Sequence, residues 1–254
     1  MTTPVLFLAY NRPRYTEESL TALLATPGIA VTIFDNGSDP PTKAVLASFV
    51  SHPKVQQIIW NGRNVGMNPA VNTFLRANRD AEWVAKMDND TVVTPEWLDS
   101  LLADARLHEM DALSAWHWRP EGPAGTFWEW ATCMRESADG RILHHDYCGG
   151  TAVVLRMAFF RRYGLLYEKY ESMLGDLTLM LRHHYTSTNV GFSKNVFARL
   201  LDLQHDNGAL SGDYPEYDAQ VRLYRDAGNA WYTKMGGVPG IAAWIESRGG
   251  REKL

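Results

Sequence analysis

Residues 83–90 read WVAKMDND, an apolar run that ends in two aspartates two positions apart. Side chains of an extended segment alternate with a period of two, so Asp88 and Asp90 can face the same side where a strand ends. Carboxylate oxygens in this arrangement suit a magnesium or manganese ion. Because Asp-Asn-Asp is also ordinary turn chemistry, the rest of the sequence must decide between the two interpretations.

The first 110 residues alternate apolar runs with segments of helical length. The predicted strands are residues 5–9, 30–34, 55–60 and 83–87, and the predicted helices are residues 15–25, 42–49, 69–77 and 95–107. Asn68 before Pro69 and Thr94 before Pro95 are candidate helix caps. This alternation predicts a mixed, mostly parallel sheet flanked by helices, with its ligand beyond the carboxyl ends of the strands. The four polar loops that follow the strands should therefore meet at one edge.

The second half of the chain, residues 111–254, is less regular. Strands are predicted at residues 151–155 and 196–203, and helices at residues 177–184 and 217–226. No change of composition marks a linker. We therefore expect one domain over residues 1–254, with residues 1–110 and 111–254 as its two halves.

Composition favours a globular protein, with 45% hydrophobic residues and a formal charge of −4. A nucleic-acid partner would need a local basic patch rather than a global field. The apolar start at residues 5–9 is shorter than the roughly 7–15 residues of a signal-peptide core. No stretch approaches the roughly 18 apolar residues of a membrane span, and Cys133 and Cys148 do not form a disulfide framework. We expect a cytoplasmic protein with no membrane span.

The order and spacing of the motifs resemble the nucleotide-sugar glycosyltransferases of the GT-A fold, in particular the large inverting family 2. Residues 5–12 resemble the first strand and donor-binding loop of that family, residues 33–39 its second strand and loop, residues 64–72 its NxGxxxAxN helix start, and residues 88–90 its metal-binding DxD motif. Each motif is common alone, but their order is specific. The resemblance covers residues 5–205 and implies a GT-A fold, with residues 1–110 as the nucleotide-sugar-binding half and residues 111–254 as the acceptor-binding half.

The resemblance also implies roles for individual residues. Asp176 would be the catalytic base, and the donor would contact Tyr10, Asn11, Arg12, Asp35, Arg63, Asn64 and Asp88. Asp90, Asp88 and His205 would hold Mn2+ or Mg2+, and Gly149-Gly150 would form the glycine turn at which acceptor and donor approach. Plainer roles exist for several of these residues: Asp176 also suits a helix N-terminus, and Arg63 and His205 also suit a solvated surface.

The sequence departs from the family pattern at three points. Asn36 replaces the second acid of the uracil loop, Gly175 replaces the acid that often precedes the base, and no QxxRW motif is present. The missing QxxRW motif argues against a processive polysaccharide synthase.

Four tryptophans, at positions 116, 118, 128 and 130, lie between the metal loop and the glycine turn. Indole rings stack on sugars and bases, so Trp116 and Trp128 are candidate acceptor contacts, although a buried hairpin face explains the spacing equally. His144-His145-Asp146 with Cys148 matches none of the usual zinc patterns.

These features predict a metal-dependent, inverting hexosyl- or pentosyltransferase that uses a nucleotide-diphosphate sugar, with UDP as the expected nucleotide. The acceptor stays open between a glycan or glycoconjugate and a hydroxymethylated pyrimidine in DNA. A local basic set motivates the DNA acceptor, and solvated surface arginines explain the same residues: Arg156, Arg161, Arg162 and Arg182. The alternatives are a sugar-1-phosphate nucleotidyltransferase, whose early glycine-rich loop is missing here, and a non-catalytic nucleotide- or glycan-binding module of the same fold.

Overall fold

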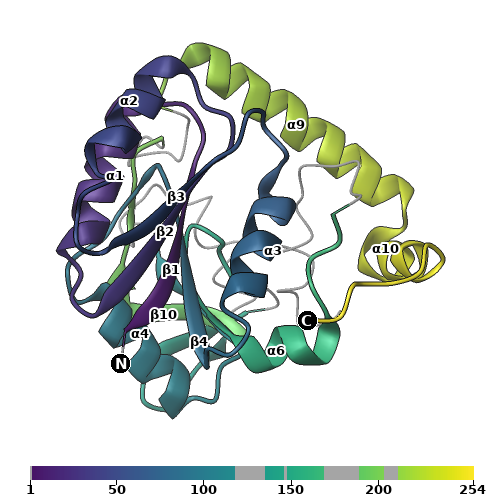
Figure 1. Cartoon of the computed structure of the whole chain (residues 1–254). Helices are drawn as coiled ribbons and strands as arrows, with labels where there is room; N and C mark the ends of the chain where they lie inside the picture. Colours follow the sequence, from purple (N-terminus) through teal and green to yellow (C-terminus); the bar gives the residue numbers. More distant parts are fainter. Residues whose placement is uncertain (1, 118–134, 146–147, 169–188, 203–210) are drawn as a thin grey trace.

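The computed structural model describes residues 2–117, 135–145, 148–168, 189–202 and 211–254 (Figure 1). The predicted helix at residues 177–184 lies outside these ranges, as do Trp118, Trp128, Trp130, Asp176 and His205.

A nine-stranded mixed sheet forms the centre of the molecule, with strand order β3-β2-β1-β4-β9-β6-β10-β8-β7. Its strands are β1 (Thr3–Ala9), β2 (Ile29–Asp35), β3 (Val55–Trp60), β4 (Trp83–Asp88), β6 (Ala112–Trp116), β7 (Arg135–Glu136), β8 (Ile142–His144), β9 (Ala152–Arg156) and β10 (Val190–Phe197). Neighbouring strands are parallel from β3 to β4 and between β6 and β10. They are antiparallel around β9 and β8. A two-stranded sheet pairs β5 (Thr91–Val92) with β11 (Arg199–Leu200), directly after the Asp88–Asp90 loop.

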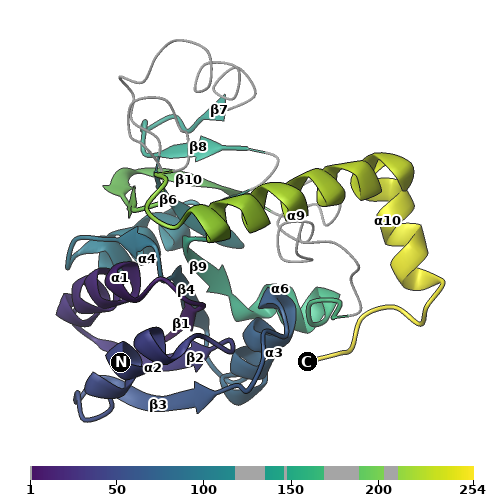
Figure 2. The same cartoon turned by 90° about the horizontal axis from the view of Figure 1, so that it is seen from above.

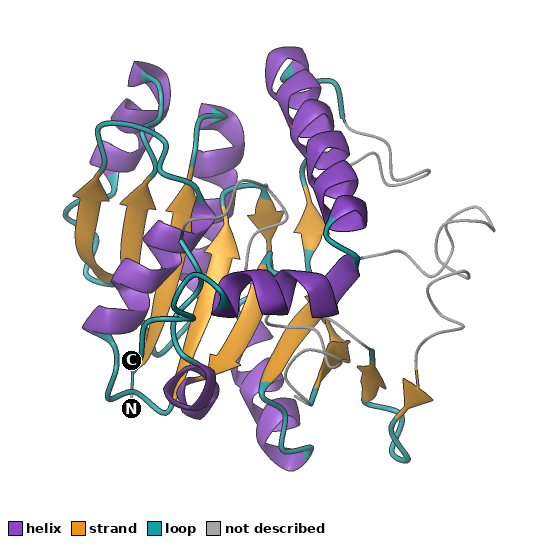
Figure 3. Cartoon of the chain, turned by 90° about the vertical axis from the view of Figure 1, so that its right-hand side faces the viewer, coloured by secondary structure: helices purple, strands orange, loops and turns teal. Residues whose placement is uncertain are grey.

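Helices cover both faces of this sheet (Figure 3). They are α1 (Pro13–Ala25), α2 (Pro40–Ser48), α3 (Met67–Ala77), α4 (Trp97–Leu107) and α6 (Met157–Tyr163), followed near the C-terminus by α9 (Pro215–Lys234) and α10 (Gly237–Glu246). Apolar side chains of α1, α2 and α4 join one core cluster, and those of α3 and α6 join the other. The sheet has a core on each face because successive side chains of a strand point to opposite faces. In β1, Val5 and Phe7 lie in the first cluster and Leu6 lies in the second. The predicted α/β layout is thereby confirmed.

Both predicted helix caps are wrong. The cap of α3 is Gly66, and the cap of α4 is Glu96. The side chain of Asn68 is buried and donates a hydrogen bond of 3.0 Å to the carbonyl oxygen of Tyr167. A buried carbonyl group needs a hydrogen-bond donor, so the Asn68 side-chain amide is oriented towards the Tyr167 carbonyl and not towards the helix start. The combination of a cap and a following proline occurs instead at α2, where Asp39 accepts a hydrogen bond from the Thr42 amide at 2.9 Å.

The predicted strand at residues 196–203 is also displaced, because β10 begins at Val190. A polar stretch hides the start of this strand in the sequence. Ser193 is buried, and its hydroxyl donates to the carboxylate of Asp104 in α4 at 2.7 Å. A buried polar side chain is tolerated where such a partner exists, and only the fold reveals the partner.

The C-terminal helices extend beyond the sheet. The long helix α9 includes the predicted helix at residues 217–226 and leads to α10 (Figure 2). Ile241 and Ile245 of α10 pack with Tyr167, and Trp231 and Trp244 line the same small cluster. None of the helices described in the structure is long and apolar enough to cross a membrane.

Candidate active site

Four loops meet at one edge of the sheet, as the strand-helix pattern predicts. The register places Ala9 beside Asp35, and Leu8 beside Asp88, at the carboxyl ends of β1, β2 and β4. The Asn11 amide donates to the Ser38 hydroxyl at 3.0 Å and joins the loops after β1 and β2. Side chains at this edge can therefore act on one ligand.

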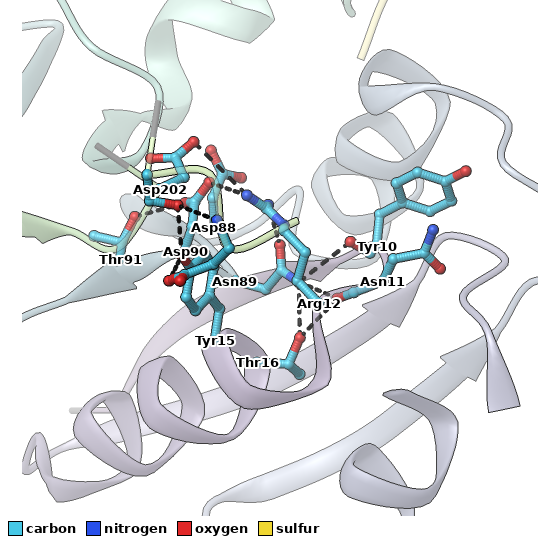
Figure 4. Close-up of polar contacts among 12 residues, drawn as sticks. Tyr10, Asn11, Arg12, Tyr15, Thr16, Asp88, Asn89, Asp90, Thr91 and Asp202 are labelled. Atoms are coloured by element: carbon cyan, nitrogen blue, oxygen red, sulfur yellow. Dashed lines mark hydrogen bonds and ion pairs between the residues drawn. The ribbon is translucent and has the colours of Figure 1, made fainter. Parts of the chain in front are cut away.

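Two segments carry the carboxylates of the site: the Asp88-Asn89-Asp90 loop after β4, and Asp202 after β11. We call them the acidic loops, and Arg12 lies between them (Figure 4). Its Nη1 donates to Oδ2 of Asp90 at 2.9 Å, and its Nη2 donates to Oδ1 of Asn89 at 2.8 Å. A carboxylate oxygen of Asp202 lies 3.7 Å from the same guanidinium group, which stacks over the Tyr217 ring at 4.1 Å from its centroid. Arg12 is only 4% exposed. The sequence predicts a donor contact at Arg12, whereas the structure pairs it with the predicted metal loop.

Asp88 pairs with a buried cation of its own. The ammonium group of Lys86 donates to Oδ1 of Asp88 at 2.5 Å and to the carbonyl oxygen of Gly150 at 2.6 Å. Burial raises the pKa of Asp88, with a further contribution from Asp90, although Lys86 favours the ionised form. One oxygen of each carboxylate of the Asp88-Asn89-Asp90 motif is therefore bound by a basic side chain.

Asp202 is a site residue that the sequence did not reveal. Burial and the neighbouring Asp90 raise the pKa of Asp202 to about 7, although Arg12 favours its ionised form. Asp202 follows β11, which pairs with β5 directly after Asp90, and the Leu201 amide donates to the Asp90 carbonyl at 2.7 Å. These contacts join residues that are far apart in sequence, so no local pattern could have predicted them. Lys86 is different, because a lysine inside an apolar strand is itself a signal of a buried partner.

The loop after β2 contains a fully buried carboxylate. Oδ1 of Asp35 accepts a hydrogen bond of 2.9 Å from the Ser38 amide, and the Lys43 ammonium group lies 4.0 Å from Oδ2. Within the described residues, Oδ2 of Asp35 has no hydrogen-bond partner. A buried acceptor of this kind is a candidate contact for a ligand that donates a hydrogen bond.

Asn36 joins the loops after β2 and β3. Its Nδ2 donates to Oδ1 of Asn64 at 3.0 Å and to the carbonyl oxygen of Gly66 at 3.2 Å. Its Oδ1 accepts from the Val65 amide at 2.9 Å. A side-chain amide can both donate and accept hydrogen bonds, whereas the acid expected at this position, when ionised, can only accept them. Asn36 thus fixes Asn64 in place, while Arg63 is exposed.

Tyr10 and Asn11 take different places in the loop after β1. Oδ1 of Asn11 accepts from the Asp39 amide at 2.9 Å, and the Tyr10 ring lies 6.5 Å from the Tyr217 ring. Both side chains point away from the guanidinium group of Arg12 (Figure 4).

The glycine turn lies against the sheet, close to the acidic loops. A Cβ atom at Gly149 would lie 2.9 Å from the Ser114 hydroxyl and 3.0 Å from Cε1 of His117, so only glycine fits without movement. Burial lowers the pKa of His117 to about 4, although a hydrogen bond to the Ala115 backbone and the charge of Asp90 oppose this shift. The ring of Trp116 is edge-on to Phe192 at 5.6 Å, and Trp116 is 8% exposed. Trp116 thus has a packing role in the described part of the chain.

The basic set near α6 is partly engaged. The guanidinium group of Arg161 donates to the carbonyl oxygens of Arg79 and Ala81 at 2.7 and 2.9 Å. Arg162 stacks over Tyr163 at 5.1 Å. Arg182 lies outside the described residues.

The mixed α/β sheet with helices on both faces is the GT-A fold. The chain belongs to glycosyl transferase family 2, because the model of that family matches residues 5–201. No curated protein sequence matches the chain significantly.

Several solved structures share the fold. TarS 1-349 from S. aureus is 18% identical with a TM-score of 0.58, and the match covers 78% of this chain and 60% of that one. The complex of TarS 1-349 with UDP-GlcNAc is 17% identical with a TM-score of 0.57, over 81% of this chain and 60% of that one. Mannosyltransferase PcManGT from Pyrobaculum calidifontis, in complex with GDP-Man and Mn2+, is 15% identical with a TM-score of 0.60, over 97% of this chain and 79% of that one. This chain thus spans less than two thirds of the TarS structures, and at these identities the similarity concerns the fold.

Proposed function

We propose that this protein is a metal-dependent glycosyltransferase that moves a sugar from a nucleotide-diphosphate sugar to an acceptor hydroxyl with inversion. The observation that carries the proposal is the meeting of Arg12, Asp35 and Asp90 at one edge of the sheet, at the carboxyl ends of parallel strands. At this edge Asp35 could accept a hydrogen bond from the nucleobase, Arg12 could bind the diphosphate, and Asp90 could bind the cation.

The buried carboxylate of Asp35 supports a uracil-containing donor. Its Oδ2 accepts no hydrogen bond from the described residues, although the Lys43 ammonium group lies 4.0 Å away, so it can accept one from a ligand. The N3–H group of uracil is a donor of the right kind. The UDP-GlcNAc bound to TarS supports a UDP sugar, and the GDP-Man bound to PcManGT supports nucleotide-diphosphate sugars more generally.

The chemistry of the acidic loop fits a divalent ion. Asp90 and Asp88 would hold Mn2+ or Mg2+, with His205 as the third expected contact, because carboxylate oxygens suit both ions. Within the described residues, no group of three His, Cys, Asp or Glu side chains is already arranged around one ion. When bound, the ion would act as a Lewis acid on the departing diphosphate. The Mn2+ in the PcManGT complex supports this assignment.

Asp176 is the proposed base, and the acceptor is proposed to enter beside Gly149 and Gly150. The close approach of Gly149 to Ser114 and His117 fixes the turn against the sheet and allows only glycine there. Trp128 stays a proposed acceptor contact, together with Trp116. A glycan or glycoconjugate and a hydroxymethylated pyrimidine in DNA are both carried forward as acceptors. The match to glycosyl transferase family 2 favours these transfer reactions over nucleotidyl transfer.

Calorimetric titration with UDP, GDP, ADP and CMP, each with Mn2+, Mg2+ or a chelator, tests the proposal. We expect one nucleoside diphosphate to bind in a metal-dependent manner, and the Asp90→Ala variant to lose that dependence together with turnover. Binding of no nucleotide under any condition would exclude the donor assignment. Full activity of Asp90→Ala would remove the metal from the mechanism.

A further inference from the structure

The two cations of the acidic loops are held in different ways. Lys86 projects from the middle of the sheet, is 1% exposed, and is fixed by both Asp88 and the Gly150 carbonyl. Arg12 projects from the loop between β1 and α1, where Asn11 and Arg12 both have positive φ angles, of 53° and 61°. Lys86 is thus anchored by the strand, whereas the position of Arg12 depends on its loop and its side-chain partners.

The guanidinium group of Arg12 occupies the position beside Asp90 at which a divalent ion would bind. Its guanidinium group binds Asp90 directly, lies 3.7 Å from Asp202, and also binds Asn89. Three carboxylates, Asp88, Asp90 and Asp202, face two basic groups, so most of their charge is already compensated. The guanidinium group of Arg12 lies against Asp90 and Asp202, while the ammonium group of Lys86 is paired with Asp88.

We propose that Arg12 is a displaceable counter-cation that competes with the divalent metal ion for Asp90. The inference rests on the proposed function, because it takes Asp90 as the metal ligand. Without nucleotide, Arg12 neutralises Asp90 and keeps the affinity for the free ion low. With a nucleoside diphosphate present, the phosphates offer the guanidinium group new acceptors, and Asp90 becomes free to bind the ion. Guanidinium groups bind phosphate oxygens well, so the exchange conserves the pairing of each charge.

Tyr217 connects this exchange to helix α9. Tyr217 belongs to the first turn of α9, and its ring centroid lies 4.1 Å from Cζ of Arg12. Two further contacts hold the same segment on α1: the Tyr15 hydroxyl donates to Asp213 at 2.5 Å, and the Tyr15 and Tyr214 rings pack edge-on at 5.0 Å. The start of α9 therefore stabilises the Arg12 position that competes with the metal.

The test measures the affinity of the protein for Mn2+ alone, by electron paramagnetic resonance of free Mn2+. Arg12→Gln removes the charge and keeps a polar side chain. We expect Arg12→Gln to bind Mn2+ roughly tenfold or more tightly than the wild type, since a desolvated competing charge is gone. Arg79→Gln is the matched control, because Arg79 is exposed and its guanidinium group pairs with Asp80, away from Asp90 and from the start of α9. Its affinity for Mn2+ should equal that of the wild type.

A second measurement tests the coupling to nucleotide. Linkage requires that UDP tighten Mn2+ binding by the same factor as Mn2+ tightens UDP binding. We expect this factor to be several-fold larger in the wild type than in Arg12→Gln, in which there is no competitor to displace. Equal affinity for Mn2+ in wild type, Arg12→Gln and Arg79→Gln would overturn the proposal.

Tyr217→Leu provides an independent variant if Arg12→Gln fails to fold. It leaves Arg12 in place and removes only the stacked ring, and we expect its Mn2+ affinity to rise about threefold, within the range of one cation–π contact. Unchanged affinity in this variant would overturn the proposal when Arg12→Gln cannot be measured. Tight Mn2+ binding by Arg12→Gln without binding of any nucleotide would support the counter-cation and contradict the donor assignment, so the two ideas fail separately.

Discussion

The ammonium group of Lys86 lies 2.5 Å from a carboxylate oxygen of Asp88 and connects it to the carbonyl oxygen of Gly150 at 2.6 Å. Lys86 and Asp88 share one face of β4 because side chains of a strand alternate. This buried lysine therefore joins the Asp88-Asn89-Asp90 loop after β4 to the glycine turn before β9. Asp88 is held in one orientation, and Asp90 is the carboxylate whose counter-cation comes from a loop.

Lys86→Met should destabilise the protein by about 1–3 kcal/mol, because it removes the partner of the partly buried Asp88 carboxylate and the donor to the Gly150 carbonyl oxygen. Asp88→Asn should cost at least as much, because it leaves the more deeply buried Lys86 ammonium group without its counter-charge. The double variant should recover part of the loss, so the two changes are coupled. Urea denaturation of the four proteins measures this coupling. Strictly additive effects would contradict the ion pair as a stabilising unit.

The sequence predicted the first half of the fold well because both cores follow simple periodicities. The predicted strand at residues 55–60 coincides with β3, and β1, β2 and β4 differ by a residue or two at their ends. Failures cluster at buried polar residues. The sequence predicts a cap at Asn68, whereas its side chain donates to the Tyr167 carbonyl oxygen. Ser193 conceals the start of β10 because its partner, Asp104, lies on another element. Polar partners across the fold carry no local pattern.

The candidate site was predictable only in part for the same reason. Asp35, Asp88 and Asp90 follow strands, and the topology of an α/β sheet brings such loops together. Asp202 was missed because β11 reaches Asp90 through a pairing with β5 that involves two residues on each strand. The pairing of Arg12 with Asp90 was missed because a short loop with two positive φ angles, not a motif, directs the guanidinium group.

Asn36→Asp should weaken the junction between the loops after β2 and β3. A carboxylate at this position would face the Gly66 carbonyl oxygen, which the Asn36 amide now satisfies at 3.2 Å. We expect a loss of about 1–3 kcal/mol in the free energy of unfolding, with weaker nucleotide binding. Asn36→Ala is the matched comparison, because it removes the same hydrogen bonds without adding charge. If the Asp variant is as stable as the wild type, the loop junction does not depend on the donor group of Asn36.

His117 should contribute a measurable pH dependence of stability. Burial lowers the pKa of its imidazole to about 4. The stabilising contribution of a base with a lowered pKa is complete above its ordinary pKa of about 6.5 and is lost as pH falls towards the folded-state value. The stability of the wild type relative to His117→Gln should therefore fall by about 1–3 kcal/mol between pH 7 and pH 4. Urea denaturation at several pH values measures this difference, and parallel curves for the two proteins would contradict a buried neutral imidazole.

Asp176→Asn should lower kcat strongly while the dissociation constant of the nucleotide donor stays nearly unchanged. A general base acts in the transition state, so its loss is seen in turnover rather than in ground-state binding. Steady-state kinetics together with donor titration separates the two quantities. Unchanged turnover would place the base elsewhere, and parallel losses in kcat and donor affinity would indicate a structural role for Asp176.

Gly37 should tolerate no side chain, and two other glycines of the chain allow the reasons to be separated. Gly37 has a φ of 80°, and a Cβ atom there would lie 2.3 Å from the carbonyl carbon of Arg63. Gly28 also has a positive φ, of 64°, but nothing lies within 4 Å of its Cβ position, and Gly62 has neither constraint.

Gly62→Ala should therefore be nearly neutral, and Gly28→Ala should cost about 1–2 kcal/mol through backbone strain alone. Gly37→Ala should cost more than Gly28→Ala and should also weaken nucleotide binding, because the loop that carries Arg63 and Asn64 must move. Urea denaturation of the three variants gives the ranking, and equal costs for Gly37→Ala and Gly28→Ala would show that the close approach of the two loops does not constrain the site.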